Sequence, residues 1–231
     1  MLVSLMILYL DFDGPLHPDA VYITASGQVE LRAPGHRLFE SMHLLEAVLE
    51  PHPSVRVVLS TSWVFMKSFS FARRQLSPSF QSRVVGATFH SREDRDSFSR
   101  MTRWQQIARD VARRRPHTWI ALDDDDFEWP DEQRHHLVKA DEWLGLQDAN
   151  CRLRLAEALA SGSSAVKASG EGAPSDGGLQ LLKDVQRKDA EDVAAGRRQA
   201  RSLWVVQPGD LEGYTFTSNP NSEFDKPGNG W

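Results

Sequence analysis

Two carboxylates follow an apolar run in the stretch Leu8-Tyr9-Leu10-Asp11-Phe12-Asp13-Gly14-Pro15-Leu16-His17-Pro18. Residues 5–10 predict a buried β-strand, because short aliphatic runs bounded by turn residues are typical of one. The chain leaves pleated geometry after this strand, aided by Gly14, so Asp11 and Asp13 can point toward one pocket. Two anions so close repel each other unless a cation lies beside them, and hard oxygen ligands with room for water suit Mg²⁺. The sequence therefore predicts a Mg²⁺ site at the carboxyl end of this strand.

Further strands and helices alternate along the chain. Strands are predicted at residues 55–59, 83–87 and 118–122, which are short runs rich in β-branched or aliphatic side chains. Helices are predicted at residues 37–49 and 102–114, where apolar side chains recur at steps of three and four residues. This alternation favours an α/β fold with a parallel sheet, helices on both of its faces, and ligands at the carboxyl ends of its strands.

The composition excludes several classes of protein. At 231 residues, 40% hydrophobic and 26% charged, the chain can bury a sizeable core and is neither wholly disordered nor collagen-like. Its single cysteine, Cys151, cannot form an intrachain disulfide, so we expect a cytoplasmic protein. The formal net charge of -5 provides no attraction of the whole chain to nucleic acid or to an anionic membrane. The apolar opening at residues 2–10 is too short to span a membrane.

The chain divides into three predicted parts. Residues 1–160 are expected to form the catalytic domain. Within it, the alternating side-chain pattern of residues 21–32 predicts a small β-hairpin, which is expected to fold over the strand ends as a flap. Residues 161–178 are rich in Ser, Gly and Ala and predict a flexible linker. The tail at residues 179–231 contains prolines and glycines without a clear period and is assigned no chemistry.

Polar residues also follow two other predicted strands. Ser60, Thr61 and Ser62 end the strand at residues 55–59, where hydroxyl and free amide groups are good donors to phosphate oxygens. Four acids at residues 123–126 end the strand at residues 118–122, and one of them would complete the metal site. Arg103 opens the helix between these two motifs, so its cation is placed to neutralise charge on a transferring phosphoryl group.

This order of motifs resembles the haloacid dehalogenase (HAD) superfamily of phosphohydrolases. The pieces Asp11-Phe12-Asp13-Gly14-Pro15-Leu16-His17-Pro18, Leu59-Ser60-Thr61-Ser62-Trp63 and Leu122-Asp123-Asp124 look most like the HAD domains associated with RNA-repair proteins. The resemblance implies that Asp11 is the nucleophile, which forms an aspartyl-phosphate, and that Asp13 is the general acid and base.

The same resemblance implies the ligands of the metal and of the phosphate. Mg²⁺ would be held by the Asp11 carboxylate, the Asp13 backbone carbonyl and an acid of the fourth motif, for which Asp124 is preferred and Asp123 is the alternative. Thr61 matches the hydroxyl that binds phosphate, with Ser60 as the alternative. Arg103 matches the basic residue of the third motif, for which the competitors are Arg100, Arg109 and Lys67.

Two aromatic residues near these motifs have more than one interpretation. His17 either orients Asp13 or touches substrate, or is a turn histidine packed beside Pro18. Trp63 suits stacking on a nucleic-acid base, but core packing is the commoner fate of tryptophan.

The resemblance to HAD enzymes also implies a class of substrate. The intervals between the first three motifs are too short for a large cap domain, and HAD enzymes without one usually act on large substrates. We therefore expect a phosphomonoester at a nucleic-acid end, or a nucleotide, as the substrate. The alternatives are a protein or small-metabolite phosphatase, and a HAD-like scaffold whose tail binds a protein partner.

Overall fold

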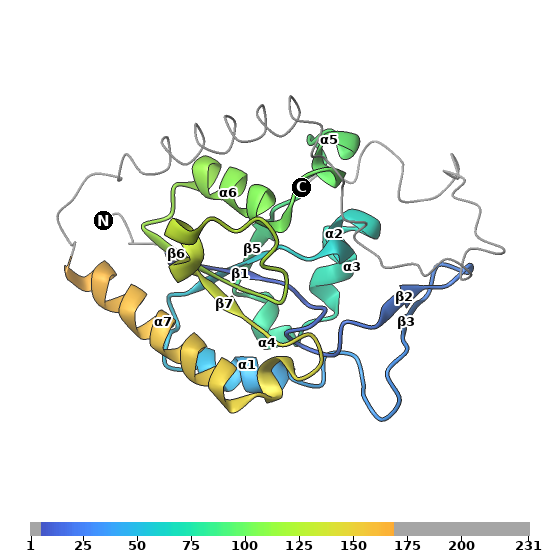
Figure 1. The fold of residues 1–231 in the computed structure, drawn as a ribbon, viewed down its shortest axis with the longest axis horizontal. Coiled ribbons are helices and arrows are strands. Elements are labelled where there is room, and N and C mark those ends of the chain that lie inside the picture. Colours follow the sequence, from blue (N-terminus) through green and yellow to red (C-terminus); the bar gives the residue numbers. More distant parts are fainter. Residues whose placement is uncertain (1–5, 169–231) are drawn as a thin grey trace.

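A five-stranded parallel sheet forms the centre of the protein (Figure 1). The computed structural model describes residues 6–168. In spatial order the strands are β5 (Val84–Ala87), β4 (Arg56–Leu59), β1 (Met6–Leu10), β6 (Thr118–Asp123) and β7 (Leu137–Lys139). The predicted α/β class and parallel sheet are confirmed. The central position of β1, between β4 and β6, brings the three predicted motifs to one edge of the sheet.

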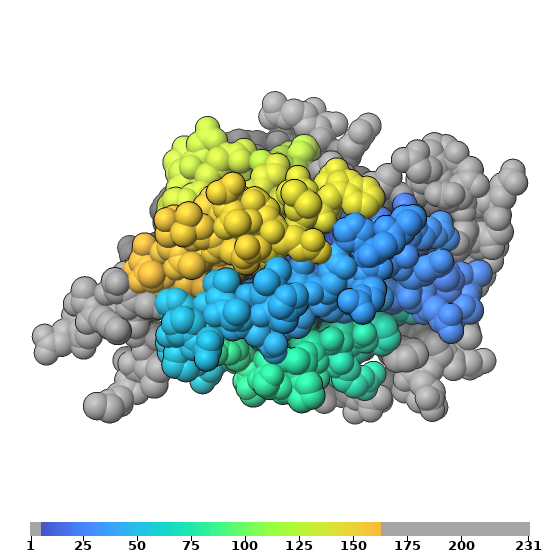
Figure 2. Space-filling view, turned by 90° about the horizontal axis from the view of Figure 1, so that it is seen from below, coloured from blue at the N-terminus to red at the C-terminus, as the bar shows by residue number. Residues whose placement is uncertain are grey.

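Helices cover both faces of the sheet. Leu8 and Leu10 of β1 pack in the same apolar cluster as the buried side chains of α1 (Met42–Leu49) and α7 (Ala149–Ala168). Ile7 and Tyr9 point the other way and pack with α6 (Arg103–Arg114). This explains why the run is apolar at every position, since a strand that is buried on both faces does not alternate. Figures 1 and 2 show α1 and α7 side by side on one face of the sheet.

The start of α6 is defined by a capping box. The Thr102 hydroxyl accepts a hydrogen bond from the Gln105 amide, and the Gln105 side chain accepts one from the Thr102 amide. These reciprocal bonds satisfy two of the free backbone donors at a helix N-terminus. Arg103 is thereby the first residue of a well-anchored helix, whose axis lies along the sheet face (Figure 1).

A small antiparallel hairpin, β2 (Val21–Ile23) and β3 (Val29–Leu31), confirms the predicted flap. Gly27 in its turn has a φ of 78°, which favours glycine, and its carbonyl accepts a hydrogen bond from the Lys67 ammonium group. Between β1 and β4 the described chain contains only this hairpin and α1, so a large cap domain is absent from that interval.

The interval between β4 and α6 contains short helices and the edge strand β5. Its helices were not predicted, because four to six residues are too few to show a helical period. A serine or threonine immediately before the helix caps the first turn of three of them, and an aspartate caps the fourth. The four are α2 (Ser62–Met66), α3 (Phe69–Arg74), α4 (Pro78–Gln81) and α5 (Arg95–Ser99).

The structure corrects the predicted helix at residues 37–49, which begins only at Met42. Residues 38–41 form turns, and Phe39 has a left-handed φ of 59° that no helix contains. The Phe39 ring packs 5.1 Å from Phe12 and 5.3 Å from Trp63, centroid to centroid. Tertiary packing therefore overrides the helical period of this segment.

The predicted linker begins inside a helix. Helix α7 runs to Ala168, so residues 161–168 are helical although their composition is rich in serine and alanine. Residues 169–178 and the predicted tail at residues 179–231 lie outside the described residues, and the predicted domain limits stay a prediction. Within residues 6–168, none of the helices has the length and apolar character that a membrane crossing needs.

The remaining elements are two 3₁₀ helices, Asp131–His136 and Gly145–Gln147. The His136 ring stacks on Trp119 at 4.0 Å between centroids, and its Nδ1 lies 2.8 Å from the Trp119 carbonyl oxygen. Burial lowers the pKa of His136 to about 4, so this ring is neutral in the folded protein near neutral pH.

We expect His136 to make folding sensitive to acid. In the unfolded chain a histidine has a pKa near 6.5, so between pH 6.5 and 4 the unfolded state binds more protons and stability falls with falling pH. In His136→Phe, which keeps a stacked ring, the loss of unfolding free energy across this interval should be smaller by about 1 to 3 kcal/mol. Urea unfolding of the wild-type and His136→Phe proteins at several pH values measures this loss of unfolding free energy. Parallel losses in both proteins would contradict this assignment.

Candidate active site

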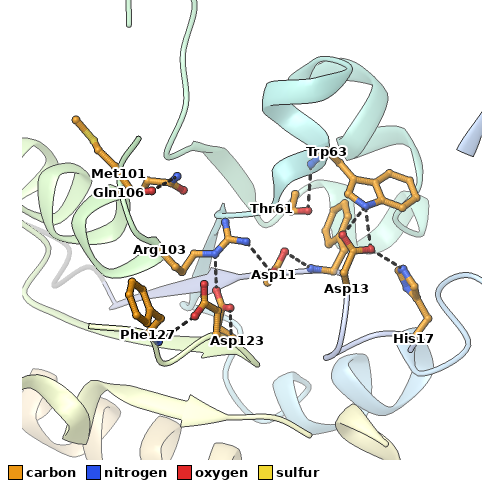
Figure 3. A network of polar contacts seen from close by, with 12 residues as sticks. Asp11, Asp13, His17, Thr61, Trp63, Met101, Arg103, Gln106, Asp123 and Phe127 are labelled. Atoms are coloured by element: carbon orange, nitrogen blue, oxygen red, sulfur yellow. Dashed lines mark hydrogen bonds and ion pairs between the residues drawn. The ribbon is translucent and has the colours of Figure 1, made fainter. Parts of the chain in front are cut away.

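Asp11 is the first residue beyond β1, and both of its carboxylate oxygens are held. Oδ1 accepts a hydrogen bond of 2.8 Å from the Phe12 amide, and Oδ2 accepts one of 2.9 Å from Arg103 (Figure 3). The Asp11 amide donates to the Leu122 carbonyl of β6, so the main chain is still paired to the sheet at this residue. The Asp11 side chain is thus buried and oriented at the carboxyl end of the central strand.

Arg103 bridges two buried aspartates. Its guanidinium contacts Asp11 and also forms an ion pair of 3.0 Å, Nε to Oδ2, with Asp123 at the end of β6 (Figure 3). Burial lowers the pKa of Arg103, but the neighbouring carboxylates raise it more, so the group stays charged. The predicted competitors lie elsewhere: Arg109 pairs with Glu93, Lys67 binds the flap, and Arg100 is exposed.

Three acids meet at this edge of the sheet. Asp11, Asp123 and Asp124 each offer a carboxylate oxygen, and these oxygens lie within 4.8 Å of one another. Burial, together with repulsion from the other carboxylates, raises the pKa of Asp11 to about 7 and that of Asp124 to about 8. Arg103 compensates only part of this negative charge. The donor set fits a divalent cation, because oxygen ligands crowded at this distance are stabilised by one.

Asp123 and Asp124 differ in what they face. The Asp123 side chain is fully buried, pairs with Arg103 through Oδ2 and accepts the Asp125 amide through Oδ1. Asp124 lines the cavity together with Asp11. Room for Asp124 depends on Gly14, which has a φ of 80° and whose absent Cβ would lie 2.6 Å from the Asp124 Cγ. Any other residue at position 14 would therefore displace Asp124.

Asp13 also reaches the cavity, but on the opposite side of Asp11 from Arg103 (Figure 3). Its carboxylate accepts hydrogen bonds from the indole of Trp63 and lies 3.0 Å from His17 Nε2. His17 was interpreted either as a residue that orients Asp13 or touches substrate, or as a turn histidine packed beside Pro18; the structure shows its contact with Asp13. Trp63 packs in the core, as expected for tryptophan, and in addition turns its N–H to the same carboxylate. This second contact was missed, because nothing in the local sequence marks a tryptophan 50 residues away as a partner.

The hydroxyl groups after β4 have different partners. The Thr61 hydroxyl accepts the Trp63 amide at 3.3 Å and so caps helix α2. The Ser60 hydroxyl is fully buried and has no hydrogen-bond partner among the described residues. Ser62 lines the cavity. The Thr61 hydroxyl only accepts in this contact, so Thr61 and Ser60 each keep a hydroxyl proton that a ligand could accept.

A cavity of about 640 Å³ opens over these groups. The flap contributes Val21 and Tyr22 to its wall, so the hairpin does lie over the strand ends. Nine acidic and three basic side chains line it, and six of these twelve come from segments to which the sequence analysis assigned no role. The charged wall residues that belong to no predicted motif are Asp19, Lys139, Asp141, Glu142, Asp148 and Arg154.

The reason for missing them is structural. Lys139 ends β7, a strand of three residues that is too short to recognise from its pattern, and Asp141 and Glu142 follow it. Asp148 and Arg154 lie just before and within the first turns of α7, a helix of weak amphipathicity. Their place in the wall depends on where β7 and α7 pack, which local sequence does not specify.

Comparison with known proteins places the chain in a family. A family model described as the HAD domain in Swiss Army Knife RNA repair proteins matches residues 7–151, more than half of the chain. Searches among curated proteins and among solved structures found no match. The matched residues contain the whole cluster of Asp11, Asp13, Arg103 and the acids after β6. The chain therefore belongs to the family of HAD domains of Swiss Army Knife RNA repair proteins.

Proposed function

We propose that this protein is a Mg²⁺-dependent phosphohydrolase that cleaves phosphomonoesters through an aspartyl-phosphate on Asp11. Membership of the HAD family supports a hydrolase. The observation that carries the proposal is the convergence of Asp11, Asp124 and Arg103 at one edge of the sheet, beside a second carboxyl, Asp13, in the same cavity. This is the set of groups that phosphoryl transfer through a carboxylate needs.

In the first step the Asp11 carboxylate attacks phosphorus, and the bond to the ester oxygen breaks. Arg103, fixed by its ion pair with Asp123, lies beside Asp11 and stabilises negative charge on the transferring group. Asp13 gives a proton to the leaving oxygen. In the second step Asp13 takes a proton from a water molecule that attacks the aspartyl-phosphate, which releases inorganic phosphate and restores Asp11.

Mg²⁺ would be held by the carboxylates of Asp11 and Asp124 and by the backbone carbonyl of Asp13. When bound, it supplies positive charge that draws the phosphoryl oxygens to the nucleophile. Asp123 is assigned a different role, because both of its oxygens already have partners in the protein. For the phosphate oxygens we propose the Thr61 hydroxyl, which accepts the Trp63 amide and keeps its own proton to donate, with the buried Ser60 hydroxyl as the alternative.

For the substrate we propose a terminal phosphate on RNA or a nucleotide. The family's association with RNA repair and the absence of a large cap between the first motifs support this choice. The acidic wall restricts how such a substrate binds, since nine acidic against three basic side chains repel a polyanion. The end of the strand would enter the cavity while the rest of the strand stays outside. A phosphoprotein or a small phosphorylated metabolite is the alternative.

Replacement of the nucleophile should abolish turnover. Asp11→Asn keeps the size of the side chain but lacks the anion that attacks phosphorus, so kcat for p-nitrophenyl phosphate with Mg²⁺ should fall by about 10³-fold or more. Asp131→Asn is the matched control, because this side chain is 94% exposed, lies on a 3₁₀ helix and is not among the residues that line the described cavity. Full metal-dependent activity in a folded Asp11→Asn protein would disprove the assignment.

Metal binding should depend on Asp124. Because a ligand that binds only the folded state raises its stability, Mg²⁺ should raise the Tm of the wild-type protein. Asp124→Asn should lose most of this rise, since it lacks one of the two carboxylates assigned to the ion, while Asp131→Asn should keep it. Thermal unfolding with and without Mg²⁺ measures both. An unchanged rise in Asp124→Asn would exclude Asp124 as a ligand.

The acidic wall predicts the salt dependence of RNA cleavage. For a protein that binds nucleic acid through a basic surface, affinity falls steeply between about 50 and about 200 mM salt. Here kcat/KM for a phosphorylated RNA oligonucleotide should hold or rise over this range, because salt screens repulsion. The p-nitrophenyl phosphate rate at each salt concentration is the control for effects on the chemistry.

The same assay separates the substrate classes. RNA oligonucleotides phosphorylated at the 3′ or the 5′ end should have a higher kcat/KM than phosphopeptides or sugar phosphates. A steep fall with salt would show that a basic surface outside the described cavity binds the RNA, and preference for a phosphopeptide or a sugar phosphate would favour the alternative.

A further inference from the structure

The two oxygens of the Asp13 carboxylate have different surroundings. Oδ1 lies 3.0 Å from the His17 Nε2 and 3.0 Å from the Trp63 indole nitrogen, whereas Oδ2 has the indole, also at 3.0 Å, as its one hydrogen-bond partner within residues 6–168. A carboxylate oxygen has about two lone-pair sites for donors. Oδ1 is therefore filled by protein donors, and Oδ2 keeps one site free on a residue that lines the cavity.

The position of the proton on His17 follows from its second contact. The Phe39 amide donates a hydrogen bond to His17 Nδ1 at 3.3 Å. A ring nitrogen that accepts a hydrogen bond carries no proton, so the proton lies on Nε2 and points at Asp13. The His17 side chain has no exposed surface, and this neutral tautomer satisfies both ring nitrogens.

An unusual backbone conformation holds this arrangement together. Phe39 adopts a φ of 59°, which is uncommon for a residue other than glycine. Its ring lies 5.0 Å from the His17 ring and 5.3 Å from Trp63, and Trp63 lies 5.7 Å from Phe12, centroid to centroid. Packed aromatic rings thus lie behind Asp13 and keep water from its donors, while the side that faces the cavity stays open.

From these contacts we propose that His17 and Trp63 are positioning residues, which hold Asp13 so that Oδ2 carries the proton exchanged with substrate. The proposal rests on the proposed phosphatase function. The Oδ2 proton passes to the ester oxygen as the bond from that oxygen to phosphorus breaks and Asp11 becomes phosphorylated. The free Oδ2 then takes a proton from the attacking water, which returns Asp13 to its starting form. Neither His17 nor Trp63 touches the substrate.

Trp63→Phe tests this role with the smallest change. It keeps a buried aromatic ring and removes the N–H that binds both oxygens of Asp13. Proton donation matters for a poor leaving group such as phenol and little for 2,4-dinitrophenol, whose anion leaves without help. We expect kcat/KM for phenyl phosphate to fall by about 10- to 100-fold, and that for 2,4-dinitrophenyl phosphate by less than about threefold. The ratio kcat/KM reports the step that forms the aspartyl-phosphate, whichever step limits kcat.

A matched control separates positioning from general loss of structure. Trp129→Phe also removes a buried indole that donates a hydrogen bond, here to the Gln133 carbonyl at 2.9 Å, outside the active site. This variant should leave the ratio of the two rates as in the wild type. Equal losses for both substrates in Trp63→Phe, or no loss for either, would overturn the proposal.

His17→Gln supplies a second variant, in which an amide N–H replaces the ring donor. It should lose less activity toward phenyl phosphate than His17→Leu, which has no donor. If Trp63 and His17 act through Asp13, neither Trp63→Phe nor His17→Leu should slow phenyl phosphate cleavage further in an Asp13→Asn background. Additive losses in that background would contradict the proposal.

The outcomes distinguish this proposal from the proposed function. Wild-type protein that hydrolyses neither aryl phosphate with Mg²⁺ overturns both. Wild-type activity that requires Asp11, together with a Trp63→Phe protein whose leaving-group dependence is unchanged, overturns the positioning role alone.

Discussion

The buried bridge that Arg103 makes between Asp11 and Asp123 is the interaction on which the site depends. Three carboxylates crowd the end of the central strands, and burial of such charges is costly unless each has a partner. Removal of one partner from a buried ion pair costs about 3 to 5 kcal/mol, because the other charge stays behind uncompensated. The guanidinium thus makes the cluster compatible with a folded core, and it leaves enough unbalanced negative charge, on Asp11 and Asp124, to attract a divalent cation.

The fold brings these groups together through strand order and helix capping. Asp11 and Asp123 end two neighbouring parallel strands, so their separation is set by the spacing of the sheet. Arg103 arrives from the other side, on a helix whose start is fixed by the capping box of Thr102 and Gln105. Gly14 completes the geometry, since only a residue without a Cβ leaves room for Asp124. Each group is therefore placed by backbone structure rather than by flexible loops.

The sequence was sufficient to predict what depends on local pattern. An apolar run followed by acids indicates a strand end, and apolar side chains at steps of three and four residues indicate the helix at residues 102–114; both signals are local. The structure adds what depends on packing: Phe39 leaves the helical region, β7 pairs over only three residues, and Trp63 reaches Asp13 from α2. The helix cap that Thr61 forms could not be predicted either, because a hydroxyl that caps a helix and one that binds phosphate look the same in sequence.

Asp11 and Asp13 lie two residues apart yet occupy different electrostatic surroundings. Burial raises the pKa of Asp11 to about 7, and the guanidinium that contacts it directly opposes this rise, which suits the proposed role of a carboxylate that attacks as an anion. The donors on Asp13 belong to two rings, and the tautomer of His17 makes both of them neutral. Neutral donors orient a carboxyl group without placing a full charge beside it, which suits the role of proton carrier that we propose for Asp13. The turn at Gly14 therefore separates two carboxyl groups with different surroundings, to which we assign the roles of nucleophile and proton carrier.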